Sequence, residues 1–379
     1  MFKRKIAAVC AFVLLLSLCS CSEPSAETPG ISAPVETSAP EEVPTPKPSD
    51  PMDGVYPVTD QEDAAEILKQ AYEGMVPQVT FAFSDAELSL QDRSIFLQNA
   101  SNQVLSEHPE LKYAYQLDCT DGPDGTICKI QYMPYKLGYP DGTPEGGLEI
   151  RSLADLVEVA DAHLGEEEIP ITILNPDLLV DDMQRALQLA GYGYVLSMLN
   201  SDATAICAFP GNSDTLEESV AQARELKNLA HSIAGQIFTD DMDDEEKLRA
   251  IYRYIVGNTS YDYRYYQDPS ALPYESRTAY GPLEYGTAIC GGFSWAFNML
   301  CREAGIPCWN VTGTGAGEEH MWNCAWMNGE YRYFDTTWDA GITDEEQWRY
   351  FACTEAEITQ NHQWGPGQEE LIHALTASK

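Results

Sequence analysis

Residues 57 to 236 alternate between two hydrophobic periods, and the same order of periods occurs twice. In the first copy, helical periodicity over residues 61–74 leads to the apolar run "VTFAFS". A second helical segment at 92–106 is followed by the alternating runs "LKYAYQLD" and "TICKIQYM". Helical periodicity predicts amphipathic helices, and alternation predicts half-buried strands. The first copy is therefore predicted to fold as helix, strand, helix, strand, strand.

The second copy has the same order, at a spacing of about 90 residues. Its helical segments are "LADLVEVADAHL" and residues 179–190, and its strand-like segments are "IPITIL", "YGYVLSML" and "TAICAF". A repeated order of elements predicts two small α+β subdomains. We assign residues 58–236 to this N-terminal region.

Helical periodicity continues over residues 214–238 and again in "EEKLRAIYRYIV", which follows the acidic run "TDDMDD". An aspartate cap with carboxylates in the first turn explains the acidic run. A calcium loop is the alternative, although the spaced Asp-x-Asp-x-Asp-Gly ligand order is absent. The tyrosine-rich stretch "SYDYRYYQDP" comes next, and we interpret its rings as core or groove wall.

A further helix is predicted after Cys290. Apolar residues there repeat at helical spacing, and Gly305 with Pro307 supplies a stop; the repeating positions are Phe293, Phe297, Leu300 and Ala304. Cys290 thus lies at or just before the first turn. Free N–H groups and the helix dipole favour a thiolate there and can stabilise an oxyanion.

A buried, unreactive thiol is the alternative for Cys290, because unpaired cysteines are usually buried. If the thiol is a nucleophile, Gly291 and Gly292 are predicted to leave room for the backbone of a bound substrate. The choice between the two interpretations depends on whether a base lies near the thiol.

Such a base is predicted by a hairpin downstream. The runs "EEHMWNCAWM" and "EYRYFDTTW" alternate, and Asn328-Gly329 between them favours a type I′ turn. A two-residue turn places Trp322 opposite Asp335. His320 shares the face of Trp322, so it lies diagonally from Asp335, within hydrogen-bond reach.

These three side chains suggest a nucleophile, a base and an orienting acid. His320 would accept the proton of Cys290, and Asp335 would hold the imidazole in place and stabilise its charged form. A three-residue hairpin loop would instead put His320 and Asp335 on opposite faces. A zinc site built from Cys290, His320 and Asp335 is the alternative use of the same residues.

The motifs "GTAICGGFSWAFNMLCREAGIPC", "HMWN" and "YFDTTWD" resemble the transglutaminase-like superfamily, relatives of the papain-like thiol enzymes. The resemblance extends from about residue 240 to 365, with "EEKLRAIYRYIVGNTSYD" and "WRYFACTEAEITQNHQW" flanking the core. It implies an α+β fold in which a helix-borne cysteine packs on an antiparallel sheet. It also implies a thioester-forming attack on a carboxamide or peptide carbonyl.

The resemblance leaves the second oxyanion donor open. The backbone N–H of Cys290 would be the first donor, and we take Tyr285 as the candidate for the second. Trp322 and Trp338 are predicted to wall the substrate site, beside Gly291 and Gly292. We expect no metal and no organic cofactor.

Some polar residues near these motifs are left out of the predicted site. Asn323 is interpreted as structural. His362 and His373 have no matched partner in the sequence pattern.

The N-terminus is predicted to be a lipoprotein signal. Basic residues at positions 3–5 precede the apolar run 6–18, and "LCSC" resembles the bacterial lipobox, which makes Cys21 the lipidated residue after removal of the leader. A signal peptide cleaved near Ser20 is the alternative. Residues 22–57, rich in Pro, Ser, Thr and Glu, predict a disordered tether.

The net charge bears on the possible partners, and the remaining cysteines bear on possible disulfide bridges. The 379 residues carry a net charge of −38, from 22 Lys and Arg against 60 Asp and Glu, which excludes nucleic acid as a partner. Cys119 and Cys128 flank the turn "TDGPDG" and are predicted to pair across a hairpin. Cysteines 301, 308, 324 and 353 are either buried thiols or two further bridges.

Together these patterns predict four segments: a leader at 1–21, a tether at 22–57, an α+β region at 58–236 and a transglutaminase-like domain at 237–379. We expect a monomeric, extracytoplasmic thiol enzyme, anchored to the membrane through Cys21, that cleaves an amide or peptide bond in a wall or surface protein. A peptide- or glycan-binding module on the same fold is the alternative, as is a cross-linking transglutaminase. Substrate identity lies beyond these patterns.

Overall fold

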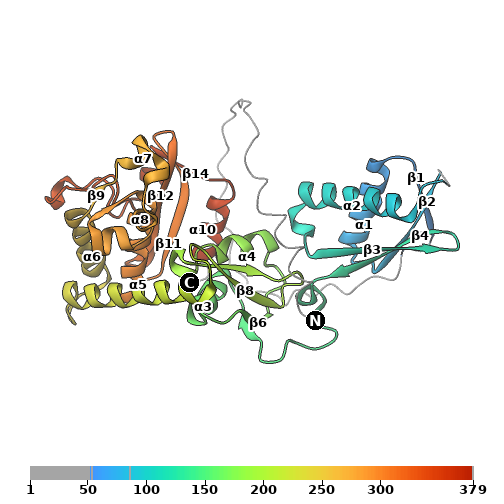
Figure 1. The fold of residues 1–379 in the computed structure, drawn as a ribbon, viewed down its shortest axis with the longest axis horizontal. Coiled ribbons are helices and arrows are strands. Elements are labelled where there is room, and N and C mark those ends of the chain that lie inside the picture. The colour runs from blue at the N-terminus through green and yellow to red at the C-terminus, as the bar shows by residue number, and fades with distance from the viewer. Residues whose placement is uncertain (1–51, 53, 85–86, 378–379) are drawn as a thin grey trace, which may run out of the picture. The chain divides into compact units, whose positions relative to one another are not determined.

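The computed structural model describes residues 52, 54–84 and 87–377 (Figure 1). The predicted leader, the lipid attachment at Cys21 and most of the predicted tether lie outside the described residues. Within the described ranges, no helix combines the length and the apolar character that a membrane span needs.

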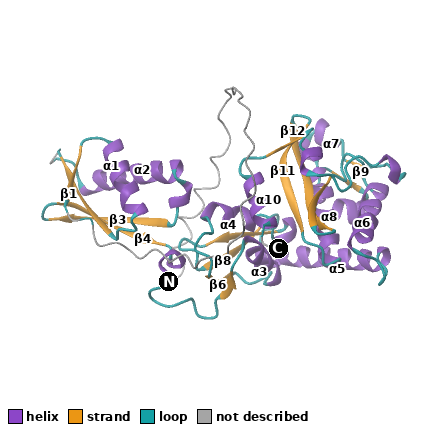
Figure 2. Cartoon of the chain, turned by 180° about the vertical axis from the view of Figure 1, so that it is seen from behind, coloured by secondary structure: helices purple, strands orange, loops and turns teal. Residues whose placement is uncertain are grey.

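The first subdomain has two helices on one face of a four-stranded sheet (Figures 1 and 2). The strand order is β1-β2-β4-β3, with β1 parallel to β2 and the other pairs antiparallel. Asp60 and Ser89 cap the two helices with their side chains. The elements are β1 (Val55–Val58), α1 (Gln61–Glu73), β2 (Gln78–Phe83), α2 (Leu90–Glu107), β3 (Ala114–Gly122) and β4 (Gly125–Tyr132).

The second subdomain has the same topology, so the predicted internal repeat is confirmed. Its strand order is β5-β6-β8-β7, again with the first pair parallel. The elements are β5 (Leu148–Ile150), α3 (Leu153–Ala162), β6 (Glu168–Ile173), α4 (Val180–Leu187), β7 (Val195–Leu199) and β8 (Ala205–Pro210). We call residues 55–210 the repeat region.

Each copy begins with a short strand that the sequence pattern missed. β1 has four residues and β5 has three, too few for a periodicity to be recognised. β1 also corrects the tether, because Val55–Pro57 pair with β2 instead of extending the predicted disordered segment.

Residues 216–376 form the C-terminal core, which begins with a helix that the sequence analysis assigned to the N-terminal region. Its main sheet has the order β13-β12-β11-β14, entirely antiparallel, with α8 packed against it (Figure 2). The elements are α5 (Leu216–Ile237), α6 (Asp244–Asn258), β9 (Ser260–Tyr261), α7 (Arg264–Gln267), β10 (Thr287–Ala288), α8 (Cys290–Glu303), β11 (Cys308–Gly315), β12 (Glu318–Met327), β13 (Glu330–Phe334), α9 (Glu355–Ile358), β14 (His362–Trp364) and α10 (Gln368–Thr376).

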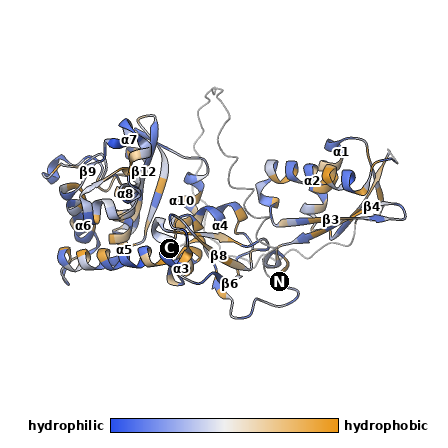
Figure 3. Ribbon diagram, in the orientation of Figure 1, coloured by the Kyte–Doolittle hydropathy of each residue, from blue (hydrophilic) through white to orange (hydrophobic). Residues whose placement is uncertain are grey.

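Helices α5, α6 and α8 share one hydrophobic cluster. Phe293 and Phe297 of α8 have no exposed surface, and each such burial stabilises the fold by roughly 1.5–3 kcal/mol. Polar and apolar residues are interspersed along α5, as its amphipathic pattern predicts (Figure 3). The acidic run before α6 is a capping box between Asp243 and Glu246, which confirms the cap interpretation.

Candidate active site

Cys290 is the first residue of α8, as the sequence predicted. The chain just before it is fixed twice: Ala288 pairs with Tyr261 in the short β9–β10 sheet, and Ile289 N–H donates to the carbonyl of Ser276 at 2.9 Å. The thiol side chain is half-buried. The first N–H groups of a helix lack partners within the helix, so they remain available to an oxyanion.

The hairpin of β12 and β13 has the predicted register. Met327 pairs with Glu330 across the Asn328-Gly329 turn, and Asn323 pairs with Phe334. Asp335 directly follows β13, and its Oδ2 lies 2.8 Å from Nε2 of His320. The predicted His–carboxylate contact is therefore present.

Cys290 lies close enough to His320 to influence the pKa of its imidazole. Because Nε2 faces Asp335, Nδ1 is the ring nitrogen left for the thiol. Burial disfavours a charged imidazole, but the interactions with Asp335 and Cys290 outweigh it and raise the pKa of His320 to about 10. The site therefore favours an imidazolium, the partner that a thiolate requires.

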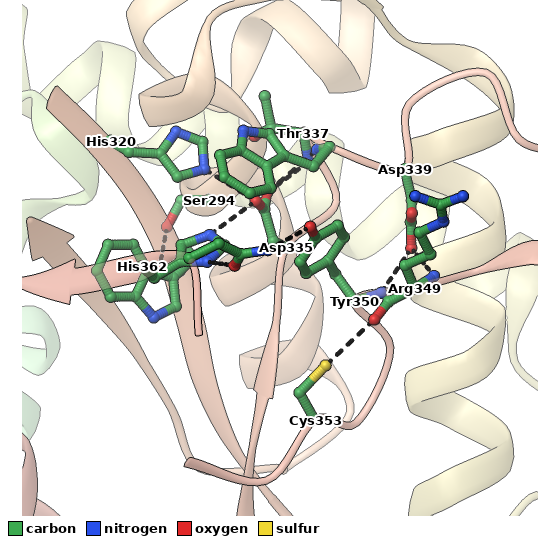
Figure 4. Close-up of polar contacts among 12 residues, drawn as sticks. Ser294, His320, Asp335, Thr337, Asp339, Arg349, Tyr350, Cys353 and His362 are labelled. Atoms are coloured by element: carbon green, nitrogen blue, oxygen red, sulfur yellow. Dashed lines mark hydrogen bonds and ion pairs between the residues drawn. The ribbon is translucent and has the colours of Figure 1, made fainter. Parts of the chain in front are cut away.

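Asp335 is 1% exposed and accepts four hydrogen bonds (Figure 4). Its Oδ2 accepts from His320 and, at 3.1 Å, from Nε2 of His362. Its Oδ1 accepts from the backbone N–H groups of Thr337 and Trp338 at 2.9 and 3.3 Å. Burial alone would raise the pKa of this carboxyl. The two histidines have the opposite and larger effect, so the net pKa is lowered to about 2. A fully buried carboxylate thus stays ionised.

His362 is the site residue that the sequence interpretation left out, and this omission was wrong. It lies at the start of β14 with no exposed side-chain surface, and its ring is held between Asp335 and Asn361 Oδ1, 2.8 Å from Nδ1. The pairing of β14 with β11 brings it there. No local pattern connects two residues that lie so far apart in the sequence.

A buried polar network ties α8 to the sheet that carries His320. Asn323 donates to the carbonyl of Ser294 at 3.0 Å and to Asn310 Oδ1 at 2.9 Å. The Ser294 hydroxyl donates to the carbonyl of Trp322 at 2.9 Å (Figure 4). These bonds fix the helix relative to β12, which agrees with the structural interpretation of Asn323.

The two glycines after Cys290 lie against the backbone of a neighbouring segment. A Cβ on Gly292 would meet the carbonyl of Ser276 at 2.7 Å and that of Thr278 at 2.9 Å, and one on Gly291 would meet the carbonyl of Arg277 at 3.2 Å. The space that these glycines provide is thus occupied by the protein's own backbone. They allow α8 to pack closely against residues 276–278, and their contact with a substrate backbone stays a prediction.

Of the two tryptophans predicted to wall the substrate site, one lines a cleft and the other lies in the core. Trp338 lines a cleft beside His320 with a volume of about 200 Å³. Trp322 is 2% exposed and stacks near the His320 ring, with centroids 6.1 Å apart. Trp322 therefore supports the imidazole inside the core and does not wall the cleft. The cleft is also lined by Tyr261, Tyr263, Tyr266, Glu318 and Glu319.

The predicted oxyanion donor, Tyr285, is 63% exposed and is not among the described residues that line the cleft beside His320. Tyr261 lies closer to the chemistry. Burial, together with the charge of Cys290, raises the pKa of the Tyr261 hydroxyl, and this side chain lines the cleft. The tyrosine-rich stretch was interpreted as core or groove wall, and its rings do form a wall.

A metal could be held by one buried set of described residues: His320, Asp335 and His362, whose ligand atoms lie within 4.8 Å of one another. This set differs from the predicted alternative, which used Cys290. The histidines and the carboxylate already bind one another directly, so a metal would have to replace those hydrogen bonds.

Comparisons with known proteins match the part of the chain that contains Cys290, His320 and Asp335. Residues 231–336 match the family model of the transglutaminase-like superfamily. The kyphoscoliosis peptidase of Mus musculus is 26% identical over 160 residues, and that of Homo sapiens is 31% identical over 133 residues. These matches cover 38% and 31% of this chain but 23% and 19% of the relatives, so the chain spans less than a quarter of their length.

Among solved structures, a TGase shares 16% identity, with coverage of 63% of this chain and 67% of that chain and a TM-score of 0.27. The family match confirms the predicted transglutaminase-like core in a mixed α+β chain.

Proposed function

We propose that the transglutaminase-like domain at residues 231–336, completed by His362, is a thiol hydrolase that cleaves amide or peptide bonds through a thioester. One observation carries this proposal: the buried carboxylate of Asp335 binds the His320 ring, and this ring lies near Cys290 at a helix start. The name peptidase given to both curated relatives supports water as the acyl acceptor.

The reaction has two halves. His320 takes the thiol proton, and the thiolate of Cys290 attacks the carbonyl carbon to form a tetrahedral oxyanion. The oxyanion collapses to a thioester as the imidazolium gives its proton to the leaving amine. A water molecule, deprotonated by His320, then attacks the thioester and releases the acid and the free thiol.

Two donors are proposed for the oxyanion. The backbone N–H of Cys290 lies at the positive end of α8, and the Tyr261 hydroxyl is the second candidate because of its place beside the thiol.

We also propose that the enzyme is held at the outer face of the membrane through a lipid on Cys21, where it meets wall or surface proteins. The leader and lipobox patterns support this placement. Replacing Cys21 by alanine should release the protein from membrane pellets and abolish the incorporation of labelled fatty acid. Retained labelling would contradict the anchor.

The enzymatic proposal is tested with a quenched-fluorescent peptide library and the Cys290→Ala variant. We expect turnover by the wild type and a loss of at least about 10³-fold in the variant. Mass spectrometry after rapid acid quench should find the acyl group on the peptide that contains Cys290. Equal activity of the variant would contradict the proposal.

A further inference from the structure

The cleft beside His320 is lined mainly by aromatic rings and carboxylates. Three tyrosines and two glutamates line it, and none of its described lining residues is a lysine or an arginine. A thiolate and an oxyanion both carry negative charge, and nearby carboxylates disfavour such charge. The His320 imidazolium in the lining offsets part of this repulsion, and a cation bound between the rings and the carboxylates would offset more of it.

The tyrosines form an exposed aromatic cluster. The ring centroid of Tyr261 lies 5.3 Å from that of Tyr263 and 6.0 Å from that of Tyr266, and the last two lie 6.5 Å apart. Tyr263 is 67% exposed and Tyr266 is 56% exposed. Faces of aromatic rings attract ammonium and guanidinium groups, and clusters of rings recognise such cations.

The glutamates come from the strand that carries the base. Glu318 and Glu319 immediately precede His320 on β12. The Tyr266 hydroxyl donates to Glu318 Oε2 at 2.7 Å, which fixes this carboxylate beside the aromatic rings. The nearby guanidinium of Arg264 binds Asp262 at 2.8 and 2.7 Å. Arg264 is thus already paired with a carboxylate outside the cleft lining.

We propose that this cleft is a subsite for a cationic group of the substrate, an ammonium or a guanidinium, held between the rings of Tyr263 and Tyr266 and the carboxylates of Glu318 and Glu319. The inference rests on the proposed function, because it names the substrate class of the same site. The net charge of −38 also attracts cationic peptides over longer distances. The cation is either a side chain of the acyl-donor peptide or the amine of an acyl acceptor.

The first experiment measures binding without turnover, with the full chain carrying Cys290→Ala. The probes are the peptides of the library that the wild type cleaves, or the library scaffold if none is cleaved, made with lysine, arginine, norleucine or glutamate at each position around the amide. We expect the lysine and arginine forms to bind about tenfold more tightly than the norleucine form at one position. This preference should shrink at high salt.

Variants assign the preference to the cleft. Glu318→Gln with Glu319→Gln should reduce the lysine-to-norleucine ratio to about twofold or less. Glu166→Gln with Glu167→Gln is the matched control, because it removes two adjacent exposed carboxylates outside the cleft lining and should leave the ratio intact. Tyr266→Phe should lower the ratio less than Tyr266→Leu, since phenylalanine keeps the ring and loses only the bond to Glu318.

A second arm distinguishes the two sources of the cation. The wild type is given a neutral acyl-donor peptide with a fluorescent diamine and, separately, with a neutral alcohol analogue of that diamine. Amine incorporation that depends on Glu318 and Glu319 would assign the cleft to an acceptor. A preference confined to peptide binding would assign it to the acyl donor.

The outcomes separate this inference from the proposed function. Equal binding of lysine and norleucine peptides at every position, together with no amine incorporation, would overturn the cationic subsite even if the wild type cleaves peptides. A glutamate-dependent lysine preference without any turnover would support the subsite and contradict the thiol hydrolase.

Discussion

The repeat region and the C-terminal core are both built of helices on four-stranded sheets, but they bury different side chains. Among the described residues of the repeat region, Asp161 is the buried carboxylate, and it pairs with Arg302 of α8. The C-terminal core buries several carboxylates and imidazoles; these are Asp262, His320, Asp335, Asp339 and His362.

Burying ionisable groups costs free energy unless each group is paired and hydrogen-bonded. The core meets this cost with many donors, as the four hydrogen bonds to Asp335 show. The repeat region, which carries a duplicated topology, is stabilised mainly by apolar burial. We therefore expect chemistry and scaffold to be separated along the chain, and this expectation can be tested one residue at a time.

The largest expected effect is that of Asp335→Asn. Asparagine keeps the shape but removes the charge that orients and stabilises the imidazolium, so kcat/KM should fall by about 10³-fold or more. The carboxylate helps to raise the pKa of His320 to about 10, so its loss should move the alkaline limb of the pH–rate profile to lower pH. A profile of peptide cleavage from pH 5 to 11 measures both.

The buried carboxylate of the repeat region provides the control. Asp161→Asn breaks the pair with Arg302 and should lower the free energy of unfolding by about 3 kcal/mol, without moving the alkaline limb. If Asp161→Asn moved the limb as far as Asp335→Asn does, the separation of scaffold and chemistry would be wrong.

His362→Ala should have a smaller effect of opposite sign on the pH profile. It removes a donor to Asp335, and a hydrogen bond to a charged group is worth about 1.5 kcal/mol or more, so kcat/KM should fall about tenfold. With one donor fewer, the carboxylate binds His320 more strongly, and the alkaline limb should move to higher pH.

A purely structural role of His362 would lower activity without moving either limb of the profile. His362→Gln keeps an N–H donor and should restore part of the loss. His373→Ala, at an exposed histidine bonded to Glu355, is the matched control and should change neither quantity. If the alkaline limb of the pH–rate profile stayed in place in His362→Ala, His362 would have no role in positioning Asp335.

Gly315→Ala tests the space around the imidazole. A Cβ there would meet Cζ2 of Trp338 at 2.7 Å and Cδ2 of His320 at 3.0 Å, so one of the rings must shift. We expect a loss of about 1–3 kcal/mol in the free energy of unfolding and several-fold slower cleavage. Gly257→Ala, in α6 with no atom within 4 Å, should stabilise the protein by up to about 1 kcal/mol.

The smallest effect on activity is expected from the hairpin cysteines of the repeat region. Cys119 and Cys128 are cross-strand partners with their sulfurs 2.8 Å apart, as the turn between them predicted, although both thiols are free in the structure. Oxidation should stabilise the protein by about 2 kcal/mol and leave kcat/KM unchanged. Melting curves with and without reductant, compared with Cys119→Ser, would show this. A change in kcat/KM on oxidation would show that the repeat region and the C-terminal core are coupled.

The parts of the site that could be predicted were those set by local rules. The helix start at Cys290 follows from apolar spacing, and the His320–Asp335 contact follows from a two-residue turn that fixes which residues share a face. The repeat was recognisable because its helices and longer strands have clear periods.

The features of the site that could not be predicted depend on packing between segments far apart in the sequence. His362 reaches Asp335 through the pairing of β14 with β11, and Gly292 is required by a carbonyl of residues 276–278, which lie outside its helix. Strand alternation shows which face of the sheet Trp322 occupies. It does not show whether that face lines a cleft or packs in the core, so the position of Trp322 could not be predicted. The first strands of the two subdomains were too short to carry a pattern.

The most direct test of the central claim is the pH dependence of Cys290 alkylation by iodoacetamide, measured on the wild type and on His320→Ala by mass spectrometry. The account predicts that wild-type alkylation reaches its plateau well below pH 8.5, where an ordinary thiol ionises, and that His320→Ala shifts the curve to higher pH. Coincident curves near pH 8.5 for both proteins would contradict the activated thiol and leave the cleft as a binding groove.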